Sequence, residues 1–316
     1  MRIYLSSGHK YPGWRYGVAA NTVYDNLARG LSELGHEVRY YVECSSDAKL
    51  PEGITAVSGF RGDEDIFHVL TVSPETPLPW VRTIHSDLRY QGWLREMVTP
   101  NCIFVSQTLA HLYGSDRFVR NGLDPADFMY SETKGNYFIF VVSGGVERAR
   151  LKGLDIAFGI TKLAEVELRV AGGGRDPAEA AELEDLCREN GAVYLGMIHG
   201  ERKAEILSDA RALLFPTQVN EAFGLVVAEA LMSGTPVIAS DKGAMREMLP
   251  PTVGFVCANY FEYLYAVANV GRIAPQDCRR WALEQFHYLS MARAYVKEYQ
   301  REIENNREAR VLSSVA

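Results

Sequence analysis

The sequence predicts an α/β protein built from two doubly wound parallel sheets. Three observations lead to this fold class. Strands and helices alternate along both halves of the chain, which is typical of βαβ units. Several strands, such as 137–142 and 212–215, are apolar throughout, as expected where helices cover both faces of a sheet. A chain of 316 residues exceeds the size at which one core keeps growing, so two domains are expected.

The elements follow one another regularly. The first half predicts a strand over 1–6, a glycine-dotted aromatic loop over 7–18, a helix ended by Gly35, strands over 37–42, 54–57, 65–70 and 81–84, a helix over 88–98, a strand over 102–105 and a helix over 106–113. The second half predicts strands over 137–142, 168–171, 193–195 and 212–215, a strand ending at Ala239, and helices over 177–190, 201–210, 223–233, 259–270, 275–285 and 288–307.

The polar stretch 131–136 reads as a linker between the halves. We therefore expect an N-terminal domain over 1–132, a second domain over 133–285, and a C-terminal helical segment over 286–316. The last helix is long, charged and sparsely apolar.

Composition excludes several classes. The chain is 47% hydrophobic and 23% charged, which indicates a globular protein, and its net charge of −7 gives no reason to expect a nucleic-acid partner. Five scattered cysteines without C-x-x-C spacing favour reduced thiols in a cytosolic protein over a disulfide framework or a zinc site. With no signal peptide and no spanning segment apparent, we expect a cytoplasmic protein, at most bound to a membrane surface.

One stretch, 213–239, contains a candidate anion site. A buried strand is stopped by Pro216, and a short helix begins near Phe223. A helix N-terminus presents unpaired N–H groups and a partial positive charge, which suits a diphosphate. Glu221 in the loop and Glu229 on the helix could hold hydroxyls on either side of that anion. A nucleoside diphosphate sugar has this layout.

A second candidate lies after the strand 137–142. There a glycine-rich turn leads into a basic segment that contains Arg148, Arg150 and Lys152. Such a turn would cup a diphosphate, and its cations would offset charge on a leaving group. A solvated basic turn is the alternative interpretation of the two arginines.

Glu221 to Glu229, with Phe223-Gly224-Leu225-Val226 between them, resembles the E-x7-E signature of retaining glycosyltransferases with the GT-B fold, the large family-4 group (glycosyl transferases group 1). The surrounding string FP-x4-E-x-FGLV-x2-EA-x2-SGTPVIAS makes the resemblance specific; an amphipathic helix with a solvated Glu229 is the alternative. The resemblance covers nearly the whole chain and is strongest over 137–248. It implies two Rossmann-like domains facing a central cleft, with the final helix crossing back onto the first domain; a coiled-coil or partner-binding arm is the rival interpretation of that helix.

The resemblance also implies roles for individual residues. Glu229 would bind the ribose hydroxyls, Glu221 the sugar hydroxyls, and Lys152 the departing diphosphate. His85, directly after the strand 81–84, would lie near the donor sugar, although a lone histidine is more often structural. We thus expect Glu221, His85 and Lys152 to be catalytic, and a donor site made of Gly17, Arg148, Lys152, Gly196, Met197, Glu221, Phe223, Gly224, Leu225 and Glu229. The acceptor side would include Lys10, Trp14, Arg15 and Tyr16.

Two departures from the family pattern stand out. The usual Gly-Arg before Lys152-Gly153 is missing, since Val146 or Gly145 occupies the arginine position. Arg148 or Arg150 could supply that charge from a loop of altered shape. In the loop after Ala239, Gly243-Ala244 replaces the family's double glycine.

The expected activity is transfer of a hexose, with retention and without a metal or other cofactor, from a nucleoside diphosphate sugar to an acceptor hydroxyl (EC 2.4.1 type). A uridine donor is favoured and a guanosine donor is second. The acceptor is a sugar, lipid or small molecule, and the protein is a monomer or homodimer. A non-catalytic nucleotide-sugar-binding module and a nucleotide-sugar epimerase or hydrolase are the alternatives.

Overall fold

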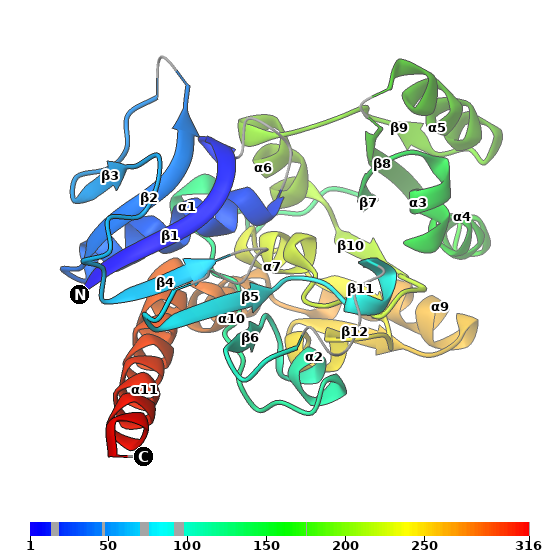
Figure 1. Ribbon diagram of the computed structural model, residues 1–316. Helices are drawn as coiled ribbons and strands as arrows, with labels where there is room; N and C mark the ends of the chain where they lie inside the picture. Colours follow the sequence, from blue (N-terminus) through cyan, green and yellow to red (C-terminus); the bar gives the residue numbers. More distant parts are fainter. Residues whose placement is uncertain (14–18, 46–47, 70–75, 92–97, 175, 316) are drawn as a thin grey trace. The chain divides into compact units, whose positions relative to one another are not determined.

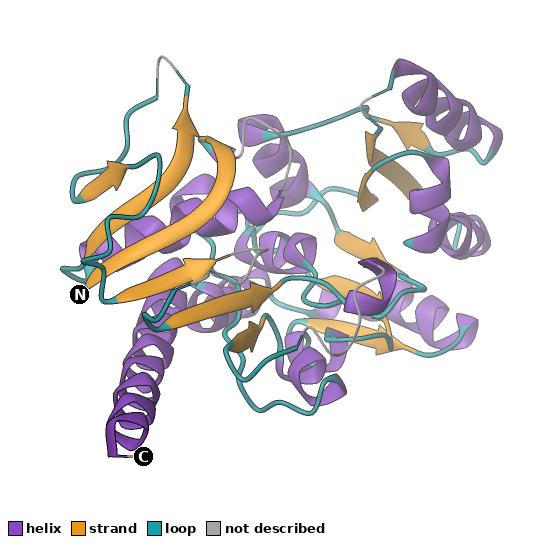
Figure 2. Cartoon of the chain, viewed as in Figure 1, coloured by secondary structure: helices purple, strands orange, loops and turns teal. Residues whose placement is uncertain are grey.

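The computed structural model describes the chain except residues 14–18, 46–47, 70–75, 92–97, 175 and 316 (Figure 1). The chain divides into two compact units: unit 1 comprises Met1–Asp124 and Phe286–Ala316, and unit 2 comprises Pro125–Gln285. Strands and helices alternate along unit 2, whereas in the described part of unit 1 several strands follow one another without a helix between them (Figure 2). The described part of each unit contains a six-stranded sheet whose strand pairs are all parallel. The predicted fold class of two doubly wound parallel sheets is therefore confirmed.

In unit 1 the strand order is β3-β2-β1-β4-β5-β6. The chain winds from β1 outward to β3 and then returns to β4 on the other side of β1. The strands are β1 (Arg2–Tyr11), β2 (Glu37–Cys44), β3 (Ile54–Ala56), β4 (Ile66–Val69), β5 (Trp80–Ile84) and β6 (Cys102–Phe104). All four residues of β4 are buried, as expected for a strand that is covered on both faces.

Unit 1 also contains helices α1 (Ala19–Glu33), α2 (Gln107–Leu112) and α11 (Tyr288–Val315). α1 and α11 pack closely because Gly30 leaves room: a Cβ atom there would lie 2.8 Å from the Cβ of Ala292. The expected helix over 88–98 is a 3-10 turn at Leu88–Gln91, and 92–97 lie outside the described residues.

A buried polar network joins α11 to the sheet. On β4, His68 Nδ1 lies 2.7 Å from Tyr299 Oη, and His68 Nε2 lies 2.7 Å from Thr83 Oγ1. Thr83 Oγ1 is in turn 2.7 Å from Tyr295 Oη. Burial, with a smaller contribution from His85, lowers the pKa of His68 from 6.5 to about 3. The folded protein therefore holds this imidazole neutral under mildly acidic conditions.

This network predicts an acid-sensitive stability. Below the ordinary histidine pKa, His68 binds a proton in the unfolded chain but not in the folded protein. The free energy of unfolding therefore decreases as the pH falls from 6.5 toward 3. Between about pH 7 and about pH 5 the expected loss from His68 is about 2 kcal/mol. Urea unfolding at both pH values should show that His68→Gln removes this part of the pH dependence. The control His111→Gln changes an exposed histidine and should leave the dependence intact; an unchanged slope in His68→Gln would contradict the prediction.

In unit 2 the strand order is β12-β11-β10-β7-β8-β9. The strands are β7 (Tyr137–Ser143), β8 (Glu167–Gly173), β9 (Val193–Tyr194), β10 (Ala212–Phe215), β11 (Val237–Ser240) and β12 (Gly254–Cys257). The chain winds from β7 to β9 and then continues on the other side of β7, so the winding reverses between β7 and β10. Open parallel sheets bind ligands beyond the carboxyl ends of their strands at such a reversal. The loops after β7 and β10 are therefore the expected place for a site.

The helices of unit 2 are α3 (Val146–Leu151), α4 (Leu154–Leu163), α5 (Pro177–Glu189), α6 (Gly200–Asp209), α7 (Leu225–Met232), α8 (Met245–Met248), α9 (Tyr260–Asn269) and α10 (Pro275–Phe286), whose last residue is counted in unit 1. Phe138, Phe140, Leu154 and Ile160 are among the buried residues of its core.

The expected linker 131–136 is joined to unit 2 by hydrogen bonds. Lys134 Nζ donates to Ser208 O over 2.7 Å and to Thr235 Oγ1 over 3.0 Å. Because of these contacts, the domain boundary expected after residue 132 falls inside a unit that begins at Pro125.

Two further observations concern the cysteines and the helices. All five cysteines, which lie in the described residues, are free thiols, and four of them are buried. Among the helices that the structure describes, none has the length and apolar content needed to span a membrane.

Candidate functional site

The loop after β10 lies directly against the turn after α3. Gly153 has a φ of +88°, and a Cβ atom there would lie only 1.9 Å from the Pro216 carbonyl oxygen. The backbone N–H of Gln218 also donates to Leu151 O over 2.9 Å. This approach of two backbones requires glycine, and it brings Lys152 beside the loop that contains Glu221.

Lys152 and Glu221 form an ion pair between Nζ and Oε2. Their side chains are 18% and 17% exposed, so both charges are largely withdrawn from water. The Lys152 ammonium also lies 5.7 Å from the ring centroid of Phe215. A predicted phosphate cation and a predicted sugar-binding carboxylate, far apart in the chain, thus meet at the carboxyl end of β10.

The loop after β11 supports the backbone of Glu221. Gly243 has a φ of +59°, and a Cβ atom there would lie 2.2 Å from Glu221 O and 2.4 Å from Glu221 N. The next residue, Ala244, donates its N–H to Glu221 O over 2.9 Å and has an ordinary right-handed conformation, with φ of −75°. The departure from a double glycine is therefore explained, because only the first of the two positions requires glycine.

Helix α7 begins at Leu225, two residues later than the sequence predicts. Gly224 takes a left-handed conformation with a φ of +87°, which turns the chain sharply into the helix. The first N–H groups of an α-helix have no acceptor within it. The N-terminus of α7 therefore presents donors and a partial positive charge next to Glu221.

Glu229 lies on α7 and forms an ion pair that sequence reasoning missed. Its Oε2 is 2.6 Å from the Nζ of Lys203, and the two side chains are 12% and 25% exposed. Lys203 belongs to α6, which follows the expected base-binding edge at Gly196 and Met197 directly in the chain. The position of Lys203 in the sequence, shortly after Gly196 and Met197, was the only feature by which sequence analysis could have identified it.

The glycine-rich turn after β7 leads into α3 at Gly145. Arg148 is exposed and precedes Lys152 by four residues, which places the two on one side of the turn. Its Cδ lies against Gly144, 2.8 Å from where a Cβ atom would be. Arg150 Nε instead lies 3.5 Å from Asp155 Oδ2. The two arginines therefore have different environments.

Gly196 and Met197 follow β9. Gly196 has a φ of +68°, and its carbonyl oxygen accepts from Gly172 N over 2.8 Å, at the end of β8. Met197 is 51% exposed. Both residues therefore lie at the carboxyl end of the sheet, and Met197 offers an accessible apolar surface.

His85 belongs to unit 1 and directly follows β5. Its ring centroid is 5.5 Å from that of Tyr24. Burial lowers the pKa of His85 to about 4, so the ring is neutral near pH 7. Among the residues that the structure describes, its buried Nε2 has no hydrogen-bond partner.

The remaining predicted residues of unit 1 are Lys10 and the group Trp14, Arg15, Tyr16 and Gly17. Lys10 is at the end of β1, where its 57% exposed side chain lies 3.8 Å from Glu43 Oε1. Trp14, Arg15, Tyr16 and Gly17 lie outside the described residues.

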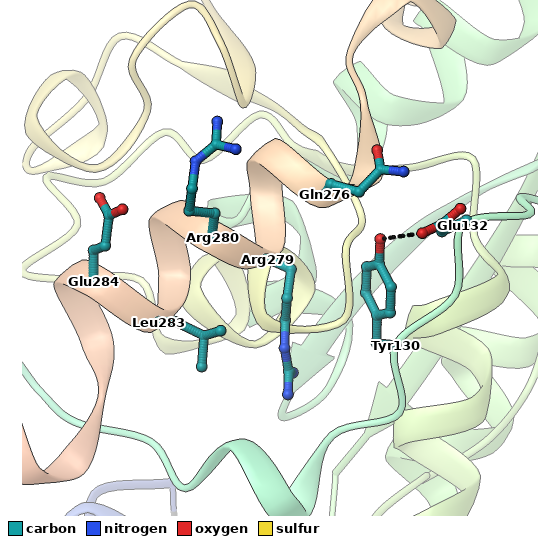
Figure 3. A pocket seen from close by; sticks show the side chains of 7 residues that line it. All are labelled: Tyr130, Glu132, Gln276, Arg279, Arg280, Leu283 and Glu284. Carbon is teal, nitrogen blue, oxygen red and sulfur yellow. Dashed lines mark hydrogen bonds between the residues drawn. The ribbon is translucent and has the colours of Figure 1, made fainter.

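A pocket of about 560 Å³ lies elsewhere in unit 2 (Figure 3). It is lined by Tyr130, Glu132, Gln276, Arg279, Arg280, Leu283 and Glu284. Arg279 Nη1 donates to the carbonyl oxygen of Met232, the last residue of α7. The pocket therefore adjoins the end of α7 opposite to Gly224, and no predicted donor-site residue lines it.

Two doubly wound parallel sheets, with E-x7-E carboxylates at the N-terminus of a helix in the second, are the features of GT-B glycosyltransferases. Residues 138–272 match the family described as glycosyl transferases group 1. The resemblance noted in the sequence is thereby confirmed.

Curated relatives agree with this family. The chain is 28% identical to a phosphatidyl-myo-inositol mannosyltransferase of Mycolicibacterium smegmatis, over 79% of this chain and 75% of that protein. It is 34% identical to a D-inositol 3-phosphate glycosyltransferase of Xylanimonas cellulosilytica, over 37% of this chain and 29% of that protein. A match to an uncharacterised glycosyltransferase of Methanocaldococcus jannaschii, at 37% identity, covers 21% of this chain and 18% of that protein.

Solved structures show the same fold. AviGT4, a glycosyltransferase involved in avilamycin A biosynthesis, superposes with a TM-score of 0.75 and 22% identity, over 96% of this chain and 98% of that chain. Sucrose-phosphate synthase from Thermosynechococcus elongatus gives a TM-score of 0.71 and 17% identity, over 95% and 98%. Anabaena HepE, solved with UDP-glucose, gives 0.67 and 14%, over 95% and 100%. The predicted GT-B fold is confirmed by these similarities.

Proposed function

We propose that the protein is a metal-independent retaining glycosyltransferase of the EC 2.4.1 type, which transfers a hexose from a nucleoside diphosphate sugar to an acceptor hydroxyl. The observation that carries the proposal is the meeting of Lys152 and Glu221 beside the N-terminus of α7. A sugar diphosphate requires a cation and a helix N-terminus for its phosphates and a carboxylate that accepts hydrogen bonds from its sugar hydroxyls.

Each group has a role in the proposed reaction. Lys152 and the first N–H groups of α7 offset the negative charge that builds on the departing diphosphate, the task that a metal ion performs in other enzymes. Glu221, with the backbone of Phe223, Gly224 and Leu225, holds the sugar. The acceptor attacks on the face from which the diphosphate leaves, and a diphosphate oxygen takes its proton.

The second phosphate cation is assigned to Arg148. Arg148 shares a side of the turn with Lys152 and lies against Gly144, whereas Arg150 is drawn toward Asp155. At the other end of the donor, Gly196 and Met197 form the edge for the base.

Unit 1 supplies the remaining groups in this proposal. Neutral His85 hydrogen-bonds a hydroxyl of the donor sugar through Nε2, which has no hydrogen-bond partner among the described residues. The glycine at position 17 lets the backbone approach the diphosphate. Lys10, Trp14, Arg15 and Tyr16 contact the acceptor.

A uridine diphosphate sugar is the favoured donor, and a guanosine diphosphate sugar is the second choice. HepE, which shares the fold, was solved with UDP-glucose, and this supports the first choice. The acceptor is a sugar, a lipid or a small molecule; the inositol-containing names of two relatives fit that range. The free and mostly buried thiols fit a cytoplasmic enzyme, at most peripheral to a membrane and acting as a monomer or homodimer.

Incubation with labelled UDP- and GDP-sugars tests the proposal. The nucleoside diphosphate that raises the melting temperature most identifies the base, because a ligand of the folded state stabilises it by mass action. Transfer of label from the donor to an added sugar, lipid or small-molecule acceptor that disappears in Glu221→Ala would support a transferase. Tight binding without turnover of any donor would indicate a non-catalytic module, and conversion of the donor alone an epimerase or hydrolase.

Glu221→Gln should separate binding from transfer. The neutral amide forms no ion pair with Lys152 and binds the ammonium less strongly, so the ammonium is more available to a diphosphate, and the free nucleoside diphosphate should bind at least as tightly as before. Turnover of the donor sugar should fall about 100-fold, because a charged acceptor for the sugar hydroxyls is lost. Calorimetry and initial rates measure the two effects. Glu205→Gln, which changes an exposed glutamate of α6, should alter neither; normal turnover in Glu221→Gln would contradict the assigned role.

A further inference from the structure

Both carboxylates of the E-x7-E pattern are paired with a lysine. Glu221 is paired with Lys152 before α7, and Glu229 on α7 is paired with Lys203 of α6. The first pair is part of the proposed chemistry. The second has no assigned purpose, although Lys203 Nζ lies only 2.6 Å from Glu229 Oε2.

The position of Glu229 on its helix explains why it needs a partner. It is four residues after Leu225, the first residue of α7, so the two lie on one face, and helical side chains lean toward the N-terminus. The carboxylate is therefore directed to the same end of α7 that would receive a diphosphate. Two like charges there would repel each other unless a cation compensates one of them.

The burial of the pair has a second consequence. Only 12% of the Glu229 side chain is exposed, and an unpaired carboxylate withdrawn from water to that degree is strongly unfavourable. Lys203 lies within ion-pair distance of the carboxylate and compensates its charge. A carboxylate is an acceptor with two oxygens. Oε2 is buried beside the ammonium and accepts no hydrogen bond from the described residues, which leaves Oε1 to receive a ribose hydroxyl.

We propose that Lys203 is a positioning residue for recognition of the donor's ribose: it holds the Glu229 side chain aimed at the ribose hydroxyls and cancels its repulsion of the diphosphate. This inference rests on the proposed function. Lys203 acts through Glu229 and does not itself take part in the transfer.

The preference for a nucleotide with ribose hydroxyls tests this inference, because a purely structural role of Lys203 would not change that preference. Dissociation constants for UDP and 2′,3′-dideoxy-UDP, or for the guanosine pair if that base binds, are measured by calorimetry. The wild type should prefer the ribonucleotide, and Glu229→Gln should lose that preference. Lys203→Met should weaken binding of the ribonucleotide about tenfold, a loss typical of one charge-assisted hydrogen bond. Binding of the dideoxynucleotide should change less. Lys203→Arg should restore most of the preference.

The matched control is Arg202→Met, one residue earlier on α6. Arg202 is 64% exposed and pairs with Glu205, so this variant should behave as wild type. In the double variant Lys203→Met/Glu229→Gln the ratio of the two constants should equal that of Glu229→Gln alone.

Three results would overturn the inference. One is a Lys203→Met protein with the wild-type ratio of the two dissociation constants. Another is an equal loss for both nucleotides that Lys203→Arg does not rescue, which would mark a structural residue. If the wild type binds neither nucleoside diphosphate, the proposed function itself fails and the inference fails with it; retained ribose preference in Lys203→Met leaves the proposed function intact.

Discussion

Replacing Lys152 with methionine is expected to lower the rate of sugar transfer by about 100- to 1,000-fold, the cost of removing one preorganised charge from a developing anion. Methionine keeps most of the aliphatic stem and removes the ammonium. Because Lys152 meets Glu221 in a largely buried pair, no solvent-exposed cation can replace it at that point. The measurement is the initial rate with the donor selected by the nucleotide screen.

The two arginines of α3 provide the controls. Arg150→Met should retain nearly full activity, because Arg150 is 56% exposed and faces Asp155. Arg148→Met should fall between the two, since Arg148 is assigned the second phosphate. A Lys152→Met enzyme that transfers sugar normally would contradict the donor site, and activity lost in Arg150→Met but kept in Arg148→Met would reverse the assignment of the arginines.

Replacing Gly243 with alanine is expected to abolish measurable donor binding and to destabilise unit 2. The left-handed conformation at φ +59° costs about 1–2 kcal/mol for any residue other than glycine. The added Cβ would in addition lie 2.2 Å from the carbonyl oxygen of Glu221, so the Glu221 backbone must shift. Thermal melting and calorimetry with the nucleoside diphosphate sugar measure the two losses.

Ala244→Gly is the matched control. Ala244 has a right-handed conformation, which glycine also accepts, and its N–H donation to Glu221 O is unchanged by the substitution. This variant should bind the donor as the wild type does. Equal behaviour of Gly243→Ala and Ala244→Gly would show that the backbone contact at Gly243 does not control the position of Glu221.

The regular parts of the fold could be predicted because their signals are local. The apolar runs at 137–142 and 212–215 predicted strands β7 and β10, and the structure extends β7 by only one residue. Helix α7 was expected two residues too early, because a left-handed Gly224 cannot be distinguished by periodicity from a first helical residue. The segment 88–98 was expected as a helix from its pattern alone, and its first residues form a 3-10 turn.

The candidate site, like the fold, could be predicted from the sequence only in part. The sequence by itself determined which chemical groups are present: the E-x7-E carboxylates, Lys152 after a glycine-rich turn, and a helix N-terminus between strands. Only the tertiary structure decided which groups meet. The pairing of Lys152 with Glu221 depends on the contact of Gly153 with Pro216, and the pairing of Lys203 with Glu229 depends on the packing of α6 against α7. Both are contacts between residues far apart in the chain, set by strand order and backbone shape, which no local pattern of residues encodes.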